Sequence, residues 1–245
     1  MSTFLRANHD IDHTSPTEDP KVTLMSRAAI VVAASHDGPT KLVRKAADRI
    51  PDLLRKAGVV QDVVVCFDSK ANLRNVYTEL YTKRRKKNSV FTFGFFAAHG
   101  SEKGLHERSG RLLLELQTCR QFDKAVLVLC SCLKTGKFPE KVIELHIEGR
   151  RCVRAVIGYE EKMGVVNPSF FNRFDPGYPK AFGEVIECHV SALLAGKSVV
   201  ETVEAIRKEW YQLLTYRHLS QRSRLVCSYN AGKIRSWGEP KAKIP

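Results

Sequence analysis

The sequence predicts an α/β fold, a three-layer sandwich in which helices flank a mostly parallel central sheet. Short apolar runs of strand length alternate with longer segments whose apolar residues recur at helical spacing. One run, Phe91–Ala98, is almost wholly apolar, as expected of a strand covered on both faces. No internal repeat or linker interrupts the alternation. We therefore expect one domain over residues 26–245, preceded by a flexible polar arm over residues 1–25.

The first half of the chain is predicted to form strands and helices in strict alternation. An apolar run at Ala28–Ser35 stops at the turn-forming residues His36-Asp37-Gly38-Pro39, which predicts a buried strand. A single helix is expected over Lys41–Ala57, with Gly58 as its stop. The following elements are a strand at Val63–Phe67, a helix at Asn72–Lys83 and a strand at Phe91–Ala98.

The second half continues the pattern. The expected elements are an amphipathic stretch at Leu112–Arg120, a strand at Ala125–Leu129, a helix at Glu140–Glu148, a strand at Val153–Gly158 and a helix that ends at Gly196. Ser198 and Glu201 have the spacing of a capping box, so a helix should begin there and run to about Leu214. The segments Leu225–Tyr229 and Lys233–Trp237 are predicted to form a terminal strand or hairpin.

Composition excludes several classes of protein. Of the 245 residues, 43% are hydrophobic and 27% are charged, which is ordinary for a globular domain and excludes a mostly disordered or collagen-like chain. No apolar run approaches the roughly 18 residues of a membrane-spanning helix. The N-terminus lacks the apolar region of a secretory signal, and the seven cysteines have no regular spacing. We therefore expect reduced thiols and a cytoplasmic location.

The charge balance favours an anionic partner. Lysine and arginine number 40 against 26 acidic residues, a net charge of +14, which raises the expectation of nucleic-acid binding. A run of five cations, Lys83–Lys87, lies between a predicted helix and a predicted strand. No zinc finger, recognition helix or RNA-binding motif accompanies it, so a solvated loop is the favoured interpretation. Nucleic acid remains a possible partner that the sequence does not favour.

Two central strands of the predicted sheet end in reactive residues. The third strand runs into His99 and Gly100, and the fourth runs into Cys132. Ligands of such sheets bind at the carboxyl ends of the strands, where these residues lie. A thiol becomes a nucleophile when a base such as imidazole is within hydrogen-bond reach. The backbone N–H groups of Gly100 and Cys132 are placed to stabilise the oxyanion of an acyl-transfer intermediate.

These motifs resemble those of the caspase-like cysteine peptidases (clan CD), most closely their CHAT-type bacterial branch, which is itself similar to separases and gingipains. The family pattern is a strand ending in His-Gly, then a strand ending in Leu-Ser-Ala-Cys with Thr/Ser-Gly soon after. This chain has Leu129-Cys130-Ser131-Cys132 followed by Thr135-Gly136. The resemblance extends to Ala155–Tyr159 and to the late segment Leu194–Val199, and covers about residues 26–238.

The resemblance implies a cysteine endopeptidase in which Cys132 attacks the peptide carbonyl and His99 transfers protons. It also implies a caspase-like fold, a protein substrate, no metal or other cofactor, and control by a separate regulatory or sensor protein. A role in bacterial defence is an expectation at the level of the family. Two departures bear on the nucleophile: Cys130 stands where the family has serine, and Thr135-Gly136 lies one residue further along than usual.

Substrate preference is expected to depend on acidic residues at the same edge of the sheet. The caspase signature Gln-Ala-Cys-x-Gly is absent, so cleavage after aspartate is not implied. In family members specific for arginine or lysine, acidic residues line the S1 pocket. Asp37, after the first strand, and Glu160 or Glu161, after the fifth, are the candidates for pairing with a basic P1 side chain.

Two other hypotheses stay open at this point. The first is a catalytically silent caspase-like scaffold that binds proteins without cutting them. The second is a basic α/β domain that binds RNA or DNA, whose affinity would fall steeply with salt. A zinc site built from Cys130, Cys132, Cys188 and His189 is disfavoured, because its spacing is wrong for a zinc knuckle and adjacent residues on a helix diverge by about 100°.

Overall fold

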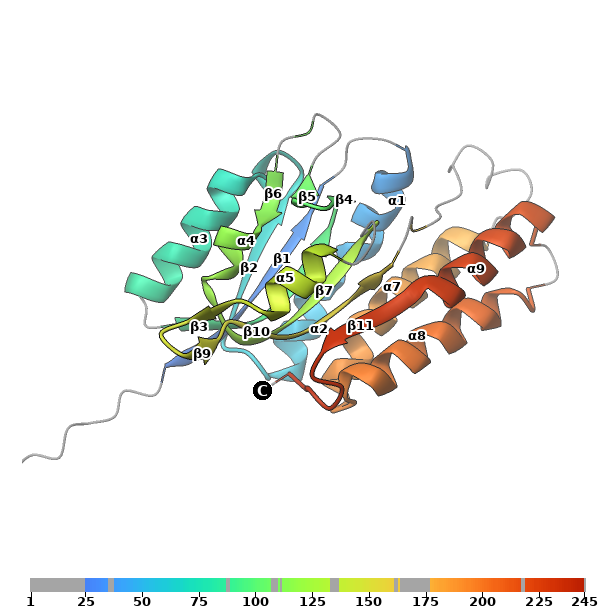
Figure 1. The fold of residues 1–245 in the computed structure, drawn as a ribbon. Helices are drawn as coiled ribbons and strands as arrows, with labels where there is room; N and C mark the ends of the chain where they lie inside the picture. The colour runs from blue at the N-terminus through green and yellow to red at the C-terminus, as the bar shows by residue number, and fades with distance from the viewer. Residues whose placement is uncertain are drawn as a thin grey trace, which may run out of the picture.

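A six-stranded sheet forms the centre of the molecule (Figure 1). The computed structural model describes residues 25–34, 38–86, 89–106, 110, 112–132, 137–160, 163, 177–216 and 219–244. The strand order is β11-β10-β7-β3-β1-β2, with all neighbours parallel except the pair β10 and β11. The strands are β1 (Ser26–Ala33), β2 (Asp62–Phe67), β3 (Ser89–Ala97), β7 (Phe122–Cys132), β10 (Val153–Tyr159) and β11 (Ile234–Gly238). The predicted mostly parallel α/β sheet is confirmed.

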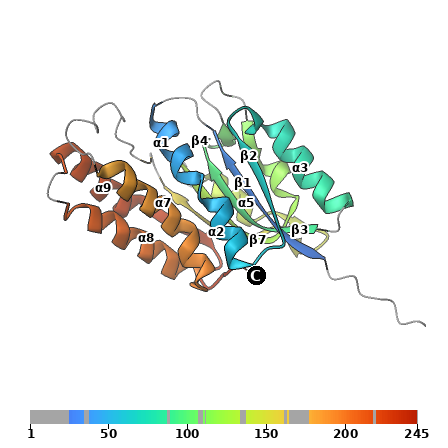
Figure 2. The same ribbon diagram turned by 180° about the vertical axis from the view of Figure 1, so that it is seen from behind.

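Helices cover both faces of this sheet, as Figures 1 and 2 show from opposite sides. One face packs against α1 (Gly38–Ala47), α2 (Ile50–Ala57), α7 (Tyr178–Leu194) and α8 (Val199–Leu213). The other packs against α3 (Leu73–Lys86), α5 (Lys137–Ile143) and a small antiparallel sheet of β4 (His99–Ser101), β5 (Gly104–His106) and β6 (Leu112–Glu115). Each face has its own cluster of buried apolar side chains, so the predicted three layers are present.

Strand β3 shows why the central strands are apolar throughout. Phe93 and Phe95 belong to the cluster under α7, whereas Phe91 and Phe96 belong to the cluster under α3. Gly94 lies between them, where a Cβ atom would come within 2.8 Å of both Leu127 Cδ2 and Phe96 Cε2. Side chains of the sheet itself fill the space beside this glycine.

The helix predicted over Lys41–Ala57 is two helices, α1 and α2. Pro51 interrupts it, because proline has no N–H to donate to the carbonyl group four residues earlier. The chain restarts with Pro51 in the first turn of α2, where the missing N–H costs nothing. Gly58 ends α2 as predicted: it adopts a left-handed conformation with φ of 67°, and its N–H donates to the carbonyl oxygen of Arg55.

One stretch predicted only to be amphipathic divides into two elements, and one further prediction of helix was partly wrong. The stretch 112–120 divides into strand β6 and the short helix α4 (Leu116–Cys119), because β6 pairs with β5 and hides Leu114 in the core. The segment 140–148 overlaps only the end of α5. It continues into a two-stranded hairpin of β8 (His146–Ile147) and β9 (Arg150–Arg151), whose turn residues Glu148 and Gly149 have φ values of 53° and 73°. Such a turn overrides helical periodicity.

The C-terminal region contains two confirmed predictions and one wrong one. The Ser198–Glu201 capping box is present at the start of α8, with both reciprocal hydrogen bonds. The strand predicted at Lys233–Trp237 is present as β11 (Ile234–Gly238), whereas Leu225–Tyr229, also predicted as a strand, lies in helix α9 (Gln221–Lys233). Ser220 caps α9 by accepting from the N–H of Ser223. The buried residues of α9 recur at helical spacing but are small or polar, which concealed the period.

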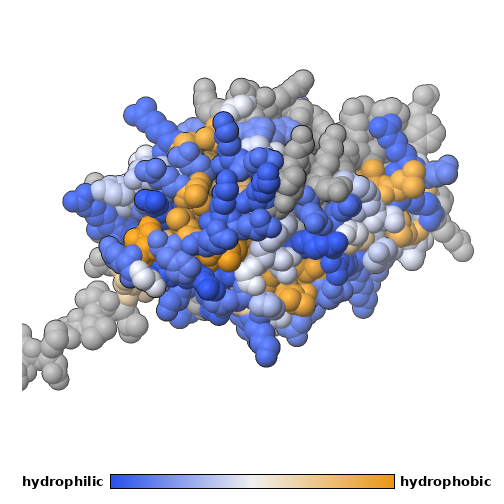
Figure 3. Space-filling view, viewed as in Figure 1, coloured by the Kyte–Doolittle hydropathy of each residue, from blue (hydrophilic) through white to orange (hydrophobic). Residues whose placement is uncertain are grey.

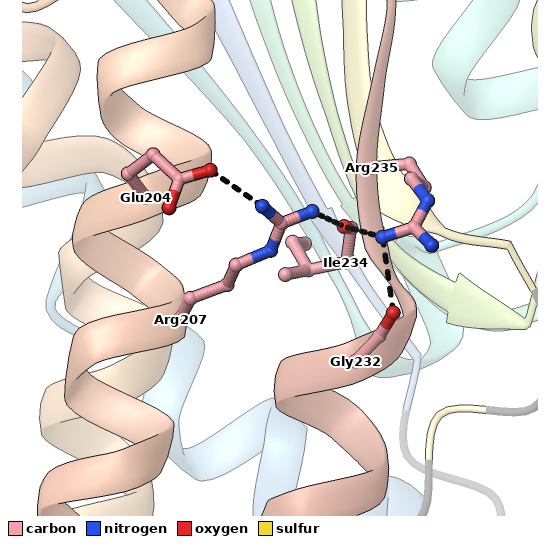
Figure 4. A network of polar contacts seen from close by, with 5 residues as sticks. All are labelled: Glu204, Arg207, Gly232, Ile234 and Arg235. Carbon is pink, nitrogen blue, oxygen red and sulfur yellow. Dashed lines mark hydrogen bonds and ion pairs between the residues drawn. The ribbon is translucent and has the colours of Figure 1, made fainter.

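Polar contacts fix the junction between α9 and β11 (Figure 4). Arg207 of α8 pairs with Glu204 and donates a hydrogen bond of 3.1 Å to the carbonyl oxygen of Ile234. Arg235 donates to the carbonyl oxygen of Gly232 at 3.0 Å. These bonds satisfy carbonyl groups at the end of α9 and hold β11 at the edge of the sheet beside β10.

Candidate active site

The two residues predicted to be catalytic lie at the carboxyl ends of neighbouring parallel strands. Strands β3 and β7 pair in a register in which Ala97 faces Cys130. His99 and Cys132 each lie two residues beyond this pair. Strand β4, which begins at His99, also contacts β7. The backbone therefore brings His99 and Cys132 to the same level of the same edge. The side chain of Cys132, like all of Thr135-Gly136, lies outside the described residues.

His99 is held by a hairpin that sequence analysis did not identify. Strands β4 and β5 are joined by the turn Glu102-Lys103, and His99 pairs with His106 across the ladder. The two imidazole rings stack with centroids 6.0 Å apart and planes inclined by 28°. The Nε2 atom of His99 is shielded from solvent. Sequence analysis missed His106 because its place opposite His99 depends on the position of the turn. In a hairpin, residues that are equally distant from the turn, here Glu102-Lys103, face each other across the ladder.

Two devices stabilise this hairpin. The Ser101 hydroxyl donates to the carbonyl oxygen of Gly104 at 3.1 Å and accepts from the N–H of Lys103 at 3.3 Å. Gly104 has φ of 147°, and a Cβ atom on it would lie 2.0 Å from the carbonyl oxygen of Leu114. Only glycine lets β5 approach β6 this closely. The hairpin that carries His99 is therefore packed against the small sheet.

Cys130, the other cysteine at this strand end, is a core residue. Its side chain is 3% exposed and belongs to the same buried cluster as Val126 and Val128. Burial raises the pKa of the Cys130 thiol. A buried neutral thiol is neither accessible nor ionised, so it is not suited to attack a substrate. The sequence left the choice between Cys130 and Cys132 to motif alignment, and the burial of Cys130 favours Cys132.

A buried network of hydrogen bonds adjoins the other side of β7. Tyr159, the last residue of β10, faces Cys132 in the ladder. The Trp210 Nε1–H donates to the Tyr159 hydroxyl at 3.0 Å, and that hydroxyl lies 3.0 Å from His189 Nε2. His189 Nδ1 lies 2.8 Å from the carbonyl oxygen of Val185. These partners assign the protons: Nδ1–H donates to the carbonyl, and Nε2 accepts from Tyr159.

This network requires a neutral His189. The side chain is fully buried, and burial lowers its pKa from 6.5 to about 4. Both ring nitrogens are engaged, so His189 is not available as a metal ligand. Cys188, its neighbour on α7, is only partly buried. Within the described residues, no group of three or more His, Cys, Asp or Glu side chains is arranged to hold a metal ion.

Of the three acidic residues predicted to recognise substrate, the structure describes only Glu160. Glu160 follows the end of β10 and pairs with Arg235 of β11, with 3.3 Å between Oε2 and Nε. Both side chains of this pair are more than two-fifths exposed. Asp37 and Glu161 lie outside the described residues. The ion pair shows that the carboxylate of Glu160 already attracts a guanidinium group, although that group belongs to the protein itself.

Three cysteine proteinase structures are among the solved structures that resemble this chain. The Arg-specific cysteine proteinase gingipain R matches with a TM-score of 0.61 and 11% identity, over 89% of this chain and 47% of that chain. The complex of the pro- and mature domains of RgpB from Porphyromonas gingivalis matches with a TM-score of 0.58 and 12% identity, over 89% and 48%. A secreted C11 cysteine protease from Bacteroides thetaiotaomicron, bound to an irreversible peptide inhibitor, gives 0.45 and 10%, over 77% and 58%.

The gingipain structures establish the fold and no more than the fold. This chain has the caspase-like α/β architecture, with its six-stranded, mostly parallel sheet and flanking helices. It spans about half the length of the gingipain chains it matches. No protein-family model and no curated protein sequence matches it. Among the described residues, none of the helices combines the length and apolarity that a bilayer crossing requires.

Proposed function

We propose that the chain is a cysteine endopeptidase that uses Cys132 as nucleophile and His99 as general acid and base. The observation that carries the proposal is the register of β3 and β7, which brings both residues to one edge of a caspase-like sheet. The burial of Cys130 supports Cys132 as the reactive sulfur. Open α/β sheets bind their ligands where the parallel strands end, which supports a site at this edge.

In the proposed reaction, His99 accepts the thiol proton of Cys132, and the thiolate forms a bond to the carbonyl carbon of the scissile peptide. The carbonyl π electrons move to oxygen. When the tetrahedral intermediate collapses, the C–N bond breaks and His99 gives its proton to the leaving amine. Water, deprotonated by His99, then attacks the thioester, which releases the acid product and restores the Cys132 thiol.

The oxyanion is proposed to accept from the N–H groups of Gly100 and Cys132. In the β4–β5 hairpin, Ser101 and Gly104 flank a two-residue turn and so form a hydrogen-bonded pair. The alternation of an antiparallel ladder then makes Gly100 and Leu105 a non-hydrogen-bonded pair. The N–H of Gly100 consequently points away from β5, as an oxyanion donor requires.

The proposed substrates are proteins cleaved after a basic P1 residue. Glu160 supports this because it lies at the correct edge and already pairs with the guanidinium group of Arg235. A basic P1 side chain would take over the place of Arg235 on this carboxylate. Asp37 and Glu161 remain candidates for the same pocket. The proposal has four further parts, which rest on the sequence alone. They are membership of the CHAT-type branch, control by a separate sensor protein, a role in bacterial defence and a cytoplasmic location.

The test is a cleavage assay with peptides that carry Arg, Lys, Asp or Leu at P1, with and without a proteome extract as a source of activator. Cys132→Ala, Cys130→Ala and Glu160→Gln are compared with the unmodified protein. We expect cleavage after Arg or Lys that is lost in Cys132→Ala and retained in Cys130→Ala. Glu160→Gln should raise KM for basic peptides and leave a Leu peptide unaffected.

Two results would contradict the proposal. If cleavage were lost only in Cys130→Ala, with the fold intact, the nucleophile would be Cys130 and not Cys132. The absence of cleavage in every condition, together with protein binding that Cys132→Ala leaves unchanged, would favour a scaffold with the caspase-like fold.

A further inference from the structure

The run of cations Lys83–Lys87 belongs largely to a helix and not to the loop that the sequence favoured. Lys83, Arg84 and Arg85 lie in α3, which continues to Lys86. Val76 and Leu80 pack in the core, and cationic side chains in the last turns of the helix make polar contacts with neighbouring residues. Lys83 pairs with Asp62, and Arg84 donates to the carbonyl oxygen of Arg120 at 3.0 Å. These cations are thus presented on an ordered surface.

Two exposed tyrosines precede this run on the same face of the helix. Tyr77 and Tyr81 are 37% and 39% exposed. Their rings are nearly parallel, with centroids 5.9 Å apart and planes inclined by 11°. Arg85, one turn further on, donates to the Tyr81 hydroxyl, and its guanidinium carbon lies 5.7 Å from the centre of that ring. The spacing i, i+4, i+8 aligns the three side chains.

A hollow opens at the amino end of the same face. It has a volume of about 720 Å³ and is lined by Asn72, Leu73, Arg74, Asn75, Tyr77, Glu115, Gln117 and Thr118. Thr118 is 1% exposed, and its hydroxyl has no hydrogen-bond partner among the described residues. Burial of a hydroxyl without a hydrogen-bond partner lowers stability, which indicates that a ligand or a water molecule supplies the missing hydrogen bond. The amide of Gln117, the carboxylate of Glu115 and the guanidinium group of Arg74 provide further polar groups.

We propose that Arg74, Tyr77, Tyr81 and Arg85, together with this hollow, form a binding surface for single-stranded nucleic acid. The name α3 surface is used for these four residues. Exposed aromatic rings that are flanked by arginines match a strand in which bases stack on aromatic faces and phosphates pair with cations. The amide and carboxylate groups of the hollow suit the amino and carbonyl edges of an unpaired base. At the left of the view, the side on which α3 lies in Figure 1, Figure 3 shows hydrophilic side chains with hydrophobic patches between them.

The dimensions and the charge agree with this partner. From Arg74 to Arg85 the helix rises about 16 Å at 1.5 Å per residue. A stacked strand has roughly one phosphate per 3.4 Å, so the α3 surface accommodates about five nucleotides. The net charge of +14 favours any polyanion, but an acidic polypeptide has no bases to stack on Tyr77 and Tyr81. The rings therefore select single-stranded nucleic acid over an acidic protein. The proposal does not depend on the peptidase activity, because the α3 surface includes neither His99 nor Cys132.

The experiment measures fluorescence anisotropy of labelled single-stranded DNA and RNA of mixed sequence, with the full chain, across a series of salt concentrations. Tyr77→Ala and Tyr81→Ala should each weaken binding about tenfold through lost stacking. The double variant Tyr77→Phe/Tyr81→Phe keeps both rings and should bind like the unmodified protein. Tyr211→Ala on α8, where the side chain is 50% exposed, is the matched control and should have no effect.

The salt series separates phosphate contacts from stacking. The slope of log K against log salt should become shallower by about 0.7 for each of Arg74→Ala and Arg85→Ala. Cys132→Ala should leave affinity and slope unchanged. Equal affinity for duplex DNA or poly-glutamate, with no effect of the tyrosine variants, would overturn the proposal in favour of unspecific attraction to polyanions. No measurable binding at 50 mM salt would also overturn it.

Discussion

The chain places a cysteine and a histidine near the end of β7 in two different environments. The core set consists of Cys130, Tyr159, His189 and Trp210, which are all buried in the cluster beneath α7 and α8. The rim set consists of His99, His106 and Cys132, at the carboxyl edge of the sheet. Residue types alone do not distinguish the two sets. The burial of the first set and the backbone position of the second at the strand ends do. We therefore expect a structural role for the first set and propose a chemical one for the second.

Burial makes the core set chemically inert. It raises the pKa of the Cys130 thiol and lowers the pKa of His189 to about 4, so both groups are neutral at neutral pH. Burial, and then the neighbouring Cys130 thiol, also raise the pKa of the Tyr159 hydroxyl. The hydrogen-bonding atoms of Tyr159, His189 and Trp210 are used within the set or on the Val185 carbonyl. By contrast, His99 and His106 are only partly buried and stand on a hairpin that ends at the rim.

The largest expected effect separates the two histidines by activity. His99→Ala should reduce kcat/KM about 10²–10⁴-fold through loss of proton transfer, with little change in the melting temperature. His189→Gln should lower the melting temperature and leave activity per folded molecule close to normal. Steady-state kinetics and thermal unfolding on both variants make the comparison. Equal loss of activity in the two folded variants would remove the distinction between the sets.

The next effect concerns stability and belongs to the core set alone. Tyr159→Phe leaves the Trp210 Nε1–H and the His189 Nε2 without their partner in the core. We expect the free energy of unfolding to fall by about 2–4 kcal/mol, measured from urea unfolding at an unchanged m-value. The matched control, Tyr211→Phe, removes an exposed hydroxyl and should change it by less than about 0.5 kcal/mol. A fall of similar size in both variants would show that the buried network contributes nothing specific.

The pH dependence of stability sharpens the account of His189. In the folded state its pKa is lowered from 6.5 to about 4, so the unfolded chain takes up the proton more readily. The stabilisation is complete above pH 6.5 and is lost as the pH falls from 6.5 to about 4, with a total of about 3 kcal/mol. Urea unfolding at several pH values should show this loss, and His189→Gln should lack it. An identical pH profile for both proteins would mean that another group is responsible.

The smallest effect tests how the rim set is positioned. His106→Ala removes the ring that stacks on His99 and should lower kcat about two- to tenfold, the equivalent of roughly 0.5–1.5 kcal/mol for an aromatic pair. His106→Phe keeps a flat ring in the same place and should restore most of the rate. KM should be unaffected in both, because His106 is assigned no contact with substrate. If His106→Phe lost as much activity as His106→Ala, the imidazole of His106 would have a chemical role and not only a stacking one.

Local patterns predicted those elements in which propensity and packing agree. The apolar run at 91–98 became the central strand β3, and the Ser198–Glu201 capping box marks the start of α8. Prediction failed where tertiary contacts override local pattern. Helix α9 buries Ser223, Cys227, Asn230 and Ala231 against its neighbours, so no apolar stripe reveals it. The stretch 112–120 was predicted only to be amphipathic, and pairing with β5 makes its first part strand β6.

The candidate site shows the same division. His99 and Cys132 could be predicted, because strand ends are visible in sequence and parallel strands end at one edge. Sequence alone could support the choice of Cys132 over Cys130 only by motif alignment, because the two cysteines share a strand and the burial of Cys130 depends on tertiary packing. His106 and the Glu160–Arg235 pair were missed for a related reason. Both depend on antiparallel pairing across a ladder, which single-residue patterns do not specify.

The most direct test of the difference between the two sets is residue-resolved alkylation of the native protein, since it needs neither substrate nor activator. The protein is treated with iodoacetamide at neutral pH, and modification of each cysteine is followed by mass spectrometry. Cys188, whose pKa burial raises to about 11, serves as the partly exposed reference. We predict that Cys132 reacts faster than Cys188, that His99→Ala slows it, and that Cys130 reacts only after unfolding. Rapid modification of Cys130 in the folded protein, or a rate at Cys132 that His99→Ala leaves unchanged, would contradict the account.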